Sequence, residues 1–209
     1  MNIPITRRAA IVSGLSTAAL LAASNGALAG LTPTPRQTRG PFYPVNFPLD
    51  SDNDLVRVKG RAARAMGDVA HLMGRVLDTQ GKPVPGARVE IWQCDAGGVY
   101  HHPGDGGRPD EDFQAYGRTL AGKDGAYRFR TIRPVPYPGR APHIHIAVRA
   151  GGFDALATQL YIAGHPLNER DFIYRRAVSR GGTIVAKFRP APSIEKGALL
   201  APFDIVLGG

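Results

Sequence analysis

Two histidines separated by a single residue have the clearest capacity for chemistry in this sequence. His143 and His145 lie in an apolar run, 143–149, that we expect to form a strand. Because successive side chains of a strand point to opposite faces, both imidazoles would face one side, with Ile144 on the other. Such a pair can bind a metal, although most pairs of this kind in β-proteins are surface or hydrogen-bonded residues.

The residues that would complete a metal site are not the usual ones. No carboxylate stands where the two-histidine, one-carboxylate site of iron(II) oxygenases would need it, and Cys94 is distant in sequence. Tyr137 stands in a proline-rich run that restricts its position, and Tyr100 follows a Gly-Gly-Val turn. A phenol ionises near pH 10, so a tyrosine ligand requires a strongly Lewis-acidic metal such as ferric iron. Taken singly, each tyrosine is better explained as an edge aromatic with a solvated hydroxyl.

Two further histidines adjoin Tyr100 and offer an alternative ligand set. His101 and His102 open a glycine-rich loop, which we interpret as the rim of a pocket or as surface. A copper or zinc site built on the His143–His145 pair and one of these two remains open. The acidic residues of the same loop lack the spacing of a calcium site and are expected to form a solvated lid: Asp105, Asp110, Glu111 and Asp112.

Composition limits the classes of protein to consider. The chain has 209 residues, 43% of them hydrophobic, enough for one core. The formal charge is +9, but the basic residues are scattered and no aromatic platform accompanies them, so we expect no nucleic-acid partner. Attraction of small anionic substrates is the simpler explanation. Cys94 is the only cysteine, which excludes an intramolecular disulfide.

The first 29 residues resemble an export signal. Arg7 and Arg8 precede an apolar stretch without acidic residues that ends in Ala27-Leu28-Ala29, a pattern suited to signal peptidase. The adjacent arginines indicate the twin-arginine route and therefore a periplasmic or secreted protein. An uncleaved anchor is the alternative, but the stretch is too polar for a good span, so no stable membrane span is expected after cleavage. We expect a signal peptide over 1–29, an extended arm over 30–68 and one domain over 69–209.

The rest of the chain is typical of an all-β protein. Short apolar runs alternate with Gly- and Pro-rich turns, and no long stretch has a helical period. Seven strands predict a β-sandwich of transthyretin- or immunoglobulin-like topology: 69–77, 88–93, 126–132, 143–149, 158–162, 183–189 and 203–207. A short helix is expected within 168–176.

Five stretches form a characteristic series along the chain: 38–44 (TRGPFYP), 89–93 (VEIWQ) with Tyr100, 129–140 (FRTIRPVPYPGR), 143–145 (HIH) and 203–207 (FDIVL). In order and content this series resembles the intradiol ring-cleavage dioxygenases, which include the protocatechuate and catechol dioxygenases. The likeness covers nearly all of 36–207.

The resemblance implies a set of roles. Tyr100, Tyr137, His143 and His145 would hold non-haem Fe(III), with Tyr137 leaving the metal when substrate binds. Arg140 would stabilise the ketonised substrate, and Gln159 would line the site. The substrates would be a catechol-type aromatic and O2, and the product a cis,cis-muconate-type diacid.

Two questions stay open at this point. The segment between Tyr137 and His143 is short, and the helical dimerisation region of catechol dioxygenases is absent, so neither the substrate nor a homo-oligomer is fixed. A non-catalytic transthyretin-like binding module is the main rival function.

Overall fold

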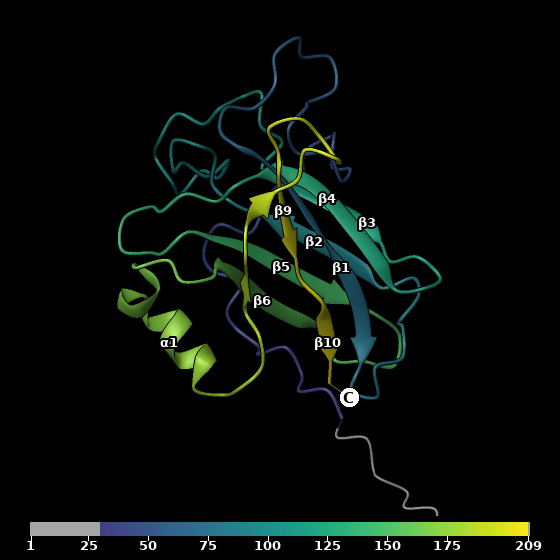
Figure 1. The fold of residues 1–209 in the computed structure, drawn as a ribbon. Helices are drawn as coiled ribbons and strands as arrows, with labels where there is room; N and C mark the ends of the chain where they lie inside the picture. The colour runs from purple at the N-terminus through teal and green to yellow at the C-terminus, as the bar shows by residue number, and fades with distance from the viewer. Residues whose placement is uncertain (1–29, 209) are drawn as a thin grey trace, which may run out of the picture.

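Two five-stranded sheets and a short helix make up the regular structure of residues 30–208, the part of the chain that the computed structural model describes (Figure 1). The expected export signal, 1–29, lies outside these residues. The first sheet contains β1 (Val69–Asp78), β4 (Ala126–Ile132), β8 (Arg189–Pro190), β9 (Leu199–Pro202) and β10 (Ile205–Leu207). The second contains β2 (Arg88–Trp92), β3 (Tyr116–Leu120), β5 (His143–Arg149), β6 (Leu156–Ile162) and β7 (Val185–Ala186).

Strand β1 is the centre of the first sheet. One edge pairs with β4 antiparallel, and the other pairs in parallel with β9 and then, further along, with β10. Between β9 and β10 the chain steps aside, and Asp204 Oδ1 accepts a hydrogen bond from Arg75 N at 2.8 Å. Gly74 permits this step, because a Cβ there would lie 1.7 Å from the Phe203 carbonyl oxygen.

The second sheet has the order β3-β2-β5-β6-β7. Its first four strands are antiparallel neighbours, and the register places His145 opposite Trp92 on one side and Gln159 on the other. Strand β5 is therefore central, with its backbone paired along both edges.

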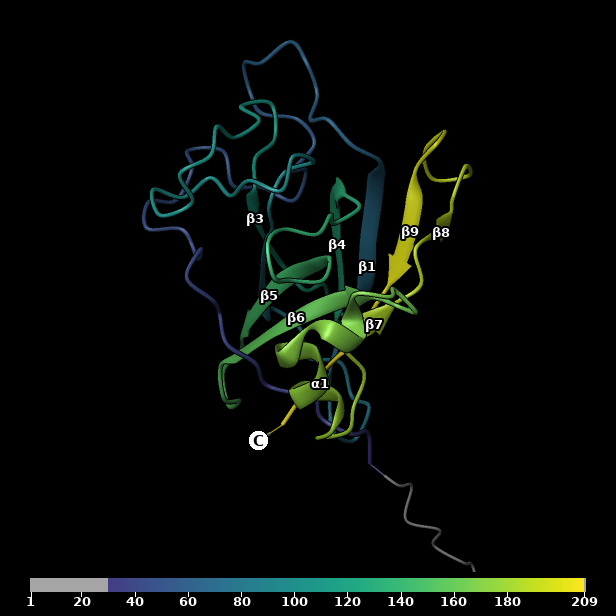
Figure 2. The same ribbon diagram turned by 90° about the vertical axis from the view of Figure 1, so that its left-hand side faces the viewer.

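The hydrophobic core lies between the two sheets, which face each other in Figure 2. Strand β5 contributes Ile144, Ile146 and Val148, each with no exposed surface. Burying a side chain of this size stabilises the fold by about 2 kcal/mol. The alternation of the strand then turns His143 and His145 to the outer face of the second sheet.

We call residues 30–68 the arm. Its part around Gly40 and Phe42 lies over that outer face, whereas Leu55 and Val56 belong to the core between the sheets. Thr34 exchanges hydrogen bonds with Val206, and Gln37 N donates to the Ala157 carbonyl at 2.7 Å. Further along, the Tyr43 hydroxyl donates to Glu90 at 2.7 Å. Arm and sheet are thus held together by specific polar contacts.

The expected all-β, two-sheet fold is confirmed, but several details of the strand prediction are wrong. Strands β3 and β9 were not predicted, and the run 183–189 is divided between β7 in one sheet and β8 in the other. The expected short helix is a 3-10 turn, Asn168–Arg170, followed by α1 (Phe172–Val178), which packs outside β6 (Figure 1). Within residues 30–208, none of the helices has the length and hydrophobicity needed to cross a bilayer.

Candidate active site

Four aromatic rings form a closed cycle on the outer face of the second sheet. The distances between neighbouring ring centroids are 5.4 Å from Tyr100 to Tyr137, 5.5 Å from Tyr137 to His143, 4.7 Å from His143 to His145 and 6.1 Å from His145 to Tyr100. These are the four residues that the sequence singled out, and the fold brings all of them together.

The two histidines are fixed by β5 and by the groups around it. His143 Nδ1 lies 2.7 Å from the Ala141 carbonyl, which can only accept, so this nitrogen carries the proton and leaves the Nε2 lone pair free. His143 Nε2 and His145 Nε2 are 3.1 Å apart. The His145 ring stacks on Trp92, with 4.8 Å between centroids and 7° between planes. On the other side Gly40, at φ +72°, lies so close that a Cβ would be 3.1 Å from His145 Cε1.

Tyr100 is held by the loop between β2 and β3. Its backbone N donates to Asp105 Oδ2 at 3.0 Å, and its ring stacks on Phe42 of the arm with centroids 4.5 Å apart. Deeper in the loop, Asp95 Oδ2 accepts from Asp110 N at 2.7 Å. The Asp110 carboxylate accepts in turn from Met66 N at 2.9 Å. The expectation of a solvated acidic lid is therefore wrong for Asp105 and Asp110, whose carboxylates bind backbone N–H groups and shape the loop.

Tyr137 and Arg140 are positioned by a tight turn, in which Arg140 N donates to the Tyr137 carbonyl at 3.0 Å. The Arg140 guanidinium then donates in four directions. Its Nε bonds to Asp171 at 2.8 Å, and its Nη1 to the Tyr137 hydroxyl at 3.2 Å. Its Nη2 bonds to Gln159 Oε1 at 2.5 Å and to the Tyr161 hydroxyl at 3.0 Å. Because the guanidinium is planar, these bonds fix its orientation toward the four rings.

Asp171 and Tyr161 were not identified from the sequence. The Asp171 carboxylate has no exposed surface; it caps α1 and also accepts from Arg140 and from Ala141 N. An aspartate directly before a helical run is a capping signal. The sequence does not show that Asp171 also binds the loop 30 residues earlier, where Ala141 N donates to it. The strand alternation could have identified Tyr161, because it shares a face of β6 with Gln159 and stands opposite His143.

Burial dominates the protonation of these groups. It raises the pKa of the Tyr100 phenol well above 10, and the neighbouring Tyr137 adds to the effect. Burial also raises the pKa of Tyr137, although the Arg140 charge opposes it. Burial, and secondly the Arg140 charge, lower the pKa of His143 to about 4. Burial, and secondly the neighbouring His143, hold the pKa of His145 well below its usual value. At neutral pH the protein therefore presents neutral imidazoles and neutral phenols.

The charge of Arg140 sets the protonation state of Asp171. Burial acts to raise the pKa of Asp171, but the hydrogen bond and charge of Arg140 outweigh it and hold the pKa below its usual range. The carboxylate is therefore ionised at neutral pH, which keeps the bond to Arg140 charge-assisted.

Comparison with known proteins identifies the family. The sequence profile of a family described as "Dioxygenase" matches residues 38–209. The chain is 34% identical over 193 residues to a protocatechuate 3,4-dioxygenase beta chain of Burkholderia cepacia, covering 86% of this chain and 82% of the relative. The chain belongs to the intradiol ring-cleavage dioxygenases. This is a family of oxidoreductases, and the resemblance drawn from the sequence is confirmed.

Other relatives of this dioxygenase differ in length. This chain is 34% identical to a hydroxyquinol 1,2-dioxygenase of Nocardioides simplex over 154 residues. The match covers 65% of this chain but only 49% of the relative. The solved dioxygenase domain of a dioxygenase–carbohydrate-binding fusion from Streptomyces sp. SirexAA-E superposes with a TM-score of 0.67 at 31% identity. That match covers 84% of this chain and 98% of the domain.

The donor set of this dioxygenase suits a highly charged cation. Among residues 30–208, no three His, Cys, Asp or Glu side chains lie close enough together to hold a metal, so a site at the four rings needs the phenol oxygens. The Tyr100 hydroxyl is buried and has no hydrogen-bond partner in the described part of the chain. Leaving such a group unsatisfied costs about 1–3 kcal/mol, and a cation bound there would relieve that cost.

His101 and His102 do not join the ring cycle. His101 is exposed and lies edge-on to Phe113, with centroids 6.3 Å apart. His102 Nδ1 accepts from Gly104 N at 3.0 Å. The alternative ligand set that included them gains no support from the structure.

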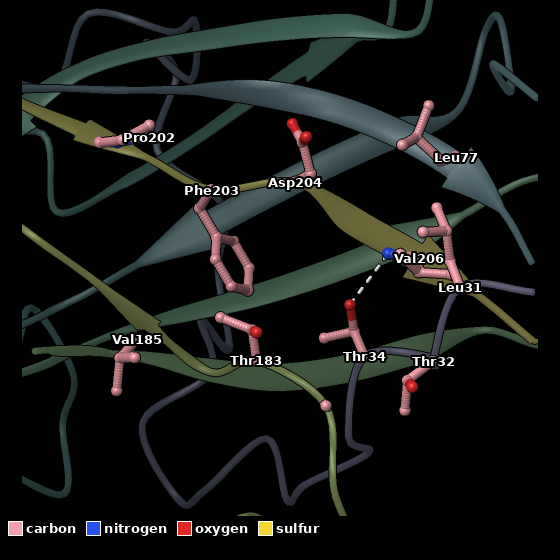
Figure 3. Close-up of a pocket in the computed structure, with 11 residues that line it drawn as sticks. Leu31, Thr32, Thr34, Leu77, Thr183, Val185, Pro202, Phe203, Asp204 and Val206 are labelled. Atoms are coloured by element: carbon pink, nitrogen blue, oxygen red, sulfur yellow. Dashed lines mark hydrogen bonds between the residues drawn. The ribbon is translucent and has the colours of Figure 1, made fainter. Parts of the chain in front are cut away.

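Of two pockets in the described part of the chain, one borders the candidate site and the other does not. One of about 240 Å³ borders Tyr137, Arg140 and Asp171 and so leads directly to the candidate residues. Another, of about 570 Å³, lies between the start of the arm and β10 (Figure 3). None of the candidate residues lines it, and Figure 3 shows Thr34 bonded to Val206 at its side, so it is a seam where the arm meets the sheet.

Proposed function

We propose that this protein is a non-haem Fe(III) dioxygenase that cleaves a catechol-type ring between its two hydroxylated carbons. O2 is the co-substrate, and a cis,cis-muconate-type diacid is the product. The closed cycle of two imidazoles and two phenols beside a fixed arginine carries the proposal. Family membership favours it over a non-catalytic binding module.

Tyr100, Tyr137, His143 and His145 would hold the iron. Bound there, ferric iron would supply the Lewis acidity that favours the ionised forms of the two phenols and of the catechol, and prepares the ring for attack by O2. The neutral imidazoles are already in the protonation state that a metal ligand needs.

Tyr137 is suited to moving a proton. It is only half-buried and borders the pocket of about 240 Å³, whereas Tyr100 is 3% exposed and enclosed by Phe42. Of the two phenols, Tyr137, once ionised as a metal ligand, would therefore be the one that can turn away and accept a proton from an incoming catechol hydroxyl at its Oη. Arg140 Nη1 already donates to that oxygen at 3.2 Å and would steady it during the exchange.

Arg140 would stabilise the reacting ring, and Gln159 would line the site and hold Arg140 in place. The guanidinium is held by Asp171, Gln159 and Tyr161, so its charge points at the site without reorganisation. A fixed positive charge of this kind stabilises oxyanions that develop on a substrate as its hydroxyls become carbonyls. Gln159 anchors the arrangement to the arm, because its Nε2 donates to the Thr38 carbonyl at 3.0 Å.

Iron content, colour and oxygen uptake of the purified protein test this function together. We expect about one iron per chain, a broad visible band that shifts when a catechol is added under nitrogen, and oxygen consumption in air. Catechol, protocatechuate and hydroxyquinol form the substrate panel, since relatives are named for these compounds. Protein that stays colourless and iron-free after reconstitution with ferric iron would refute the proposal.

A matched pair of variants isolates the tyrosine ligation. Tyr137→Phe removes the half-buried phenol of the ring cycle, whereas Tyr174→Phe removes a phenol of α1 outside it. Only the first should shift the visible band and lower ring cleavage.

We also propose that the protein is exported, through the arginine pair and the cleavage pattern within 1–29. Fractionation of cells that produce the full chain tests this, with Arg7→Lys and Arg8→Lys together as the variant that should retain the protein inside. The oligomeric state, including a homo-oligomer, would be measured on the same exported material.

A further inference from the structure

A second pocket lies behind the arm, separate from the four rings. Its volume is about 360 Å³, and its walls come from the arm and from α1 and the turn that follows it. The lining residues are Arg36, Gln37, Thr38, Phe172, Ile173, Arg176, Ala177 and Arg180. None of them is a candidate ligand of the metal or a partner of Arg140.

The charge of this pocket is positive. Three arginines line it and no acidic residue does. Arg36 is already engaged by Asp154, at 3.6 Å. Within residues 30–208, the Arg176 side chain makes no hydrogen bond or ion pair, and Arg180 makes only a long 3.5 Å contact to a backbone carbonyl. Two guanidinium groups are therefore available to an anion, and the guanidinium fork matches a carboxylate.

The same helix and turn that carry Arg176 and Arg180 also give the pocket apolar side chains. Phe172 is 64% exposed although it is a large hydrophobic residue, and Ile173 and Ala177 lie beside it on the helix. An exposed aromatic ring next to unpaired arginines suits a ligand with a flat apolar body and an acidic end. The volume is sufficient for a single-ring or six-carbon acid, since pockets for small organic molecules begin at about 300 Å³.

Gln37 adds an uncharged donor and acceptor to the wall. Both its Nε2 and its Oε1 are shielded from solvent and have no partner in the described part of the chain. A buried amide without partners costs free energy, and a small turn of this side chain toward a polar ligand group in the pocket would recover part of that cost. This observation is independent of the charge and of the exposed phenylalanine.

We propose that this pocket is a second binding site, which takes an organic carboxylate with a flat, apolar body. Arg176 and Arg180 bind the carboxylate, Phe172 and Ile173 contact the body, and Gln37 meets a polar group. The inference does not depend on the proposed ring cleavage. Both an aromatic acid and an unsaturated diacid have the required chemistry.

Occupation of this pocket would be communicated to the four rings through the arm. Thr38 follows Gln37, and its carbonyl accepts from Gln159, the residue that bonds to Arg140. Two residues further on, Gly40 lies against His145. A ligand that fixes Gln37 would therefore steady the arm over the site. An acid that accumulates would then change the turnover of an uncharged catechol, and this effect, unlike the binding itself, rests on the proposed function.

Calorimetric titration of the iron-loaded full chain with benzoate and with cis,cis-muconate tests the pocket. The decisive variant is Arg176→Gln with Arg180→Gln, which should weaken binding of at least one of the two acids about tenfold. The control is Arg175→Gln with Arg189→Gln, which removes the same charge from two exposed arginines that line neither this pocket nor the one beside Tyr137. Binding by benzoate indicates an aromatic acid as the occupant, and binding by muconate alone indicates the diacid.

Three outcomes would overturn the proposal: binding unchanged in the first variant, binding weakened equally in both, or inorganic phosphate binding as tightly as the acids. The His145→Gln protein separates this question from catalysis. Acid binding to the second pocket should persist in it even though the metal site is damaged, and loss of that binding would place the acid at the rings instead.

Discussion

Each sheet carries a buried histidine on the outer face of its central strand, and the two are built in opposite ways. His71 on β1 and His145 on β5 are both 1% exposed. Both ring nitrogens of His71 are engaged, Nε2 with Glu195 at 3.0 Å and Nδ1 with Arg128 at 3.1 Å. His145 has only the neighbouring His143 Nε2, and its Nδ1 has no partner in the described part of the chain.

The polar groups around the two histidines also differ in whether they have hydrogen-bond partners. Around His71, Glu195 accepts two bonds from Arg130, which also holds Asp54 of the arm, so the polar groups satisfy one another. Around His145, a buried phenol and an imidazole nitrogen are left without partners. Satisfied polar groups lock a fold, whereas unsatisfied ones mark a place prepared for a ligand. The two histidines are equally buried, but only His145 stands among polar groups without partners.

The same substitution at both histidines gives the sharpest test, and the largest effect is expected at the rings. His145→Gln should lower iron content and reduce ring cleavage by about a hundredfold or more, since the loss of a residue that merely supports a metal ligand already costs about 10–100-fold. The unfolding free energy of the metal-free protein should change by less than about 1 kcal/mol. Metal analysis, oxygen uptake and urea unfolding measure the three quantities. Wild-type iron content would remove His145 from the ligand set.

His71→Gln should behave in the reverse way. It leaves the bonds of Glu195 and Arg128 incomplete in a buried setting, so we expect a loss of about 1.5 kcal/mol in unfolding free energy. Turnover per iron should stay at the wild-type level, because the cluster is on the other sheet. Chemical unfolding and steady-state kinetics on one preparation check both statements, and a large fall in turnover without a loss of stability would contradict the comparison.

Asp171→Asn tests whether Arg140 needs its carboxylate. Asparagine can still cap α1, but it binds the guanidinium without charge and with one oxygen fewer. Turnover should fall about fivefold, equivalent to about 1 kcal/mol, while iron content and the visible band stay unchanged. A band that shifts as in Tyr137→Phe would mean that Asp171 supports the metal rather than the arginine.

The smallest effect concerns acid stability. The hydrogen bonds and charge of Arg130 lower the pKa of Glu195 to about 2 from its ordinary value of 4.5. A carboxylate with a lowered pKa contributes stability that is present above pH 4.5 and is lost as the pH falls toward 2. Glu195→Gln should therefore destabilise the protein more at pH 7 than at pH 3, as measured by urea unfolding at both values. An equal difference at both would show that the charge of Glu195 is unimportant.

The sequence was a good guide where a side-chain period or a local turn decides the outcome. The alternation of β5 places His143 and His145 together, and the proline run before β5 delivers Tyr137 to them. The roles of Arg140 and Gln159 came from the family resemblance rather than from spacing. Tyr100 depends on carboxylates of its own loop, and Gln159 on the register between β5 and β6.

Contacts between distant segments explain what was missed. Strand β3 includes Gly117 and is a poor strand by propensity, but the glycine lets the arm approach, since a Cβ there would be 2.4 Å from the Asp52 carbonyl oxygen. The run 183–189 looks like one strand because strand propensity does not indicate which sheet each residue joins. Asp171 was missed because its partner Arg140 lies in another loop.

The pairing of β1 has a consequence for how the protein is made. Residues 70–78 find their parallel partners only in 199–207, so the first sheet cannot close until the ribosome has passed that point. Contacts so distant in sequence carry a high loop-closure entropy and slow the folding of β-proteins. Until then one edge of β1 has no backbone partner, which makes the nascent chain vulnerable to aggregation and dependent on chaperones.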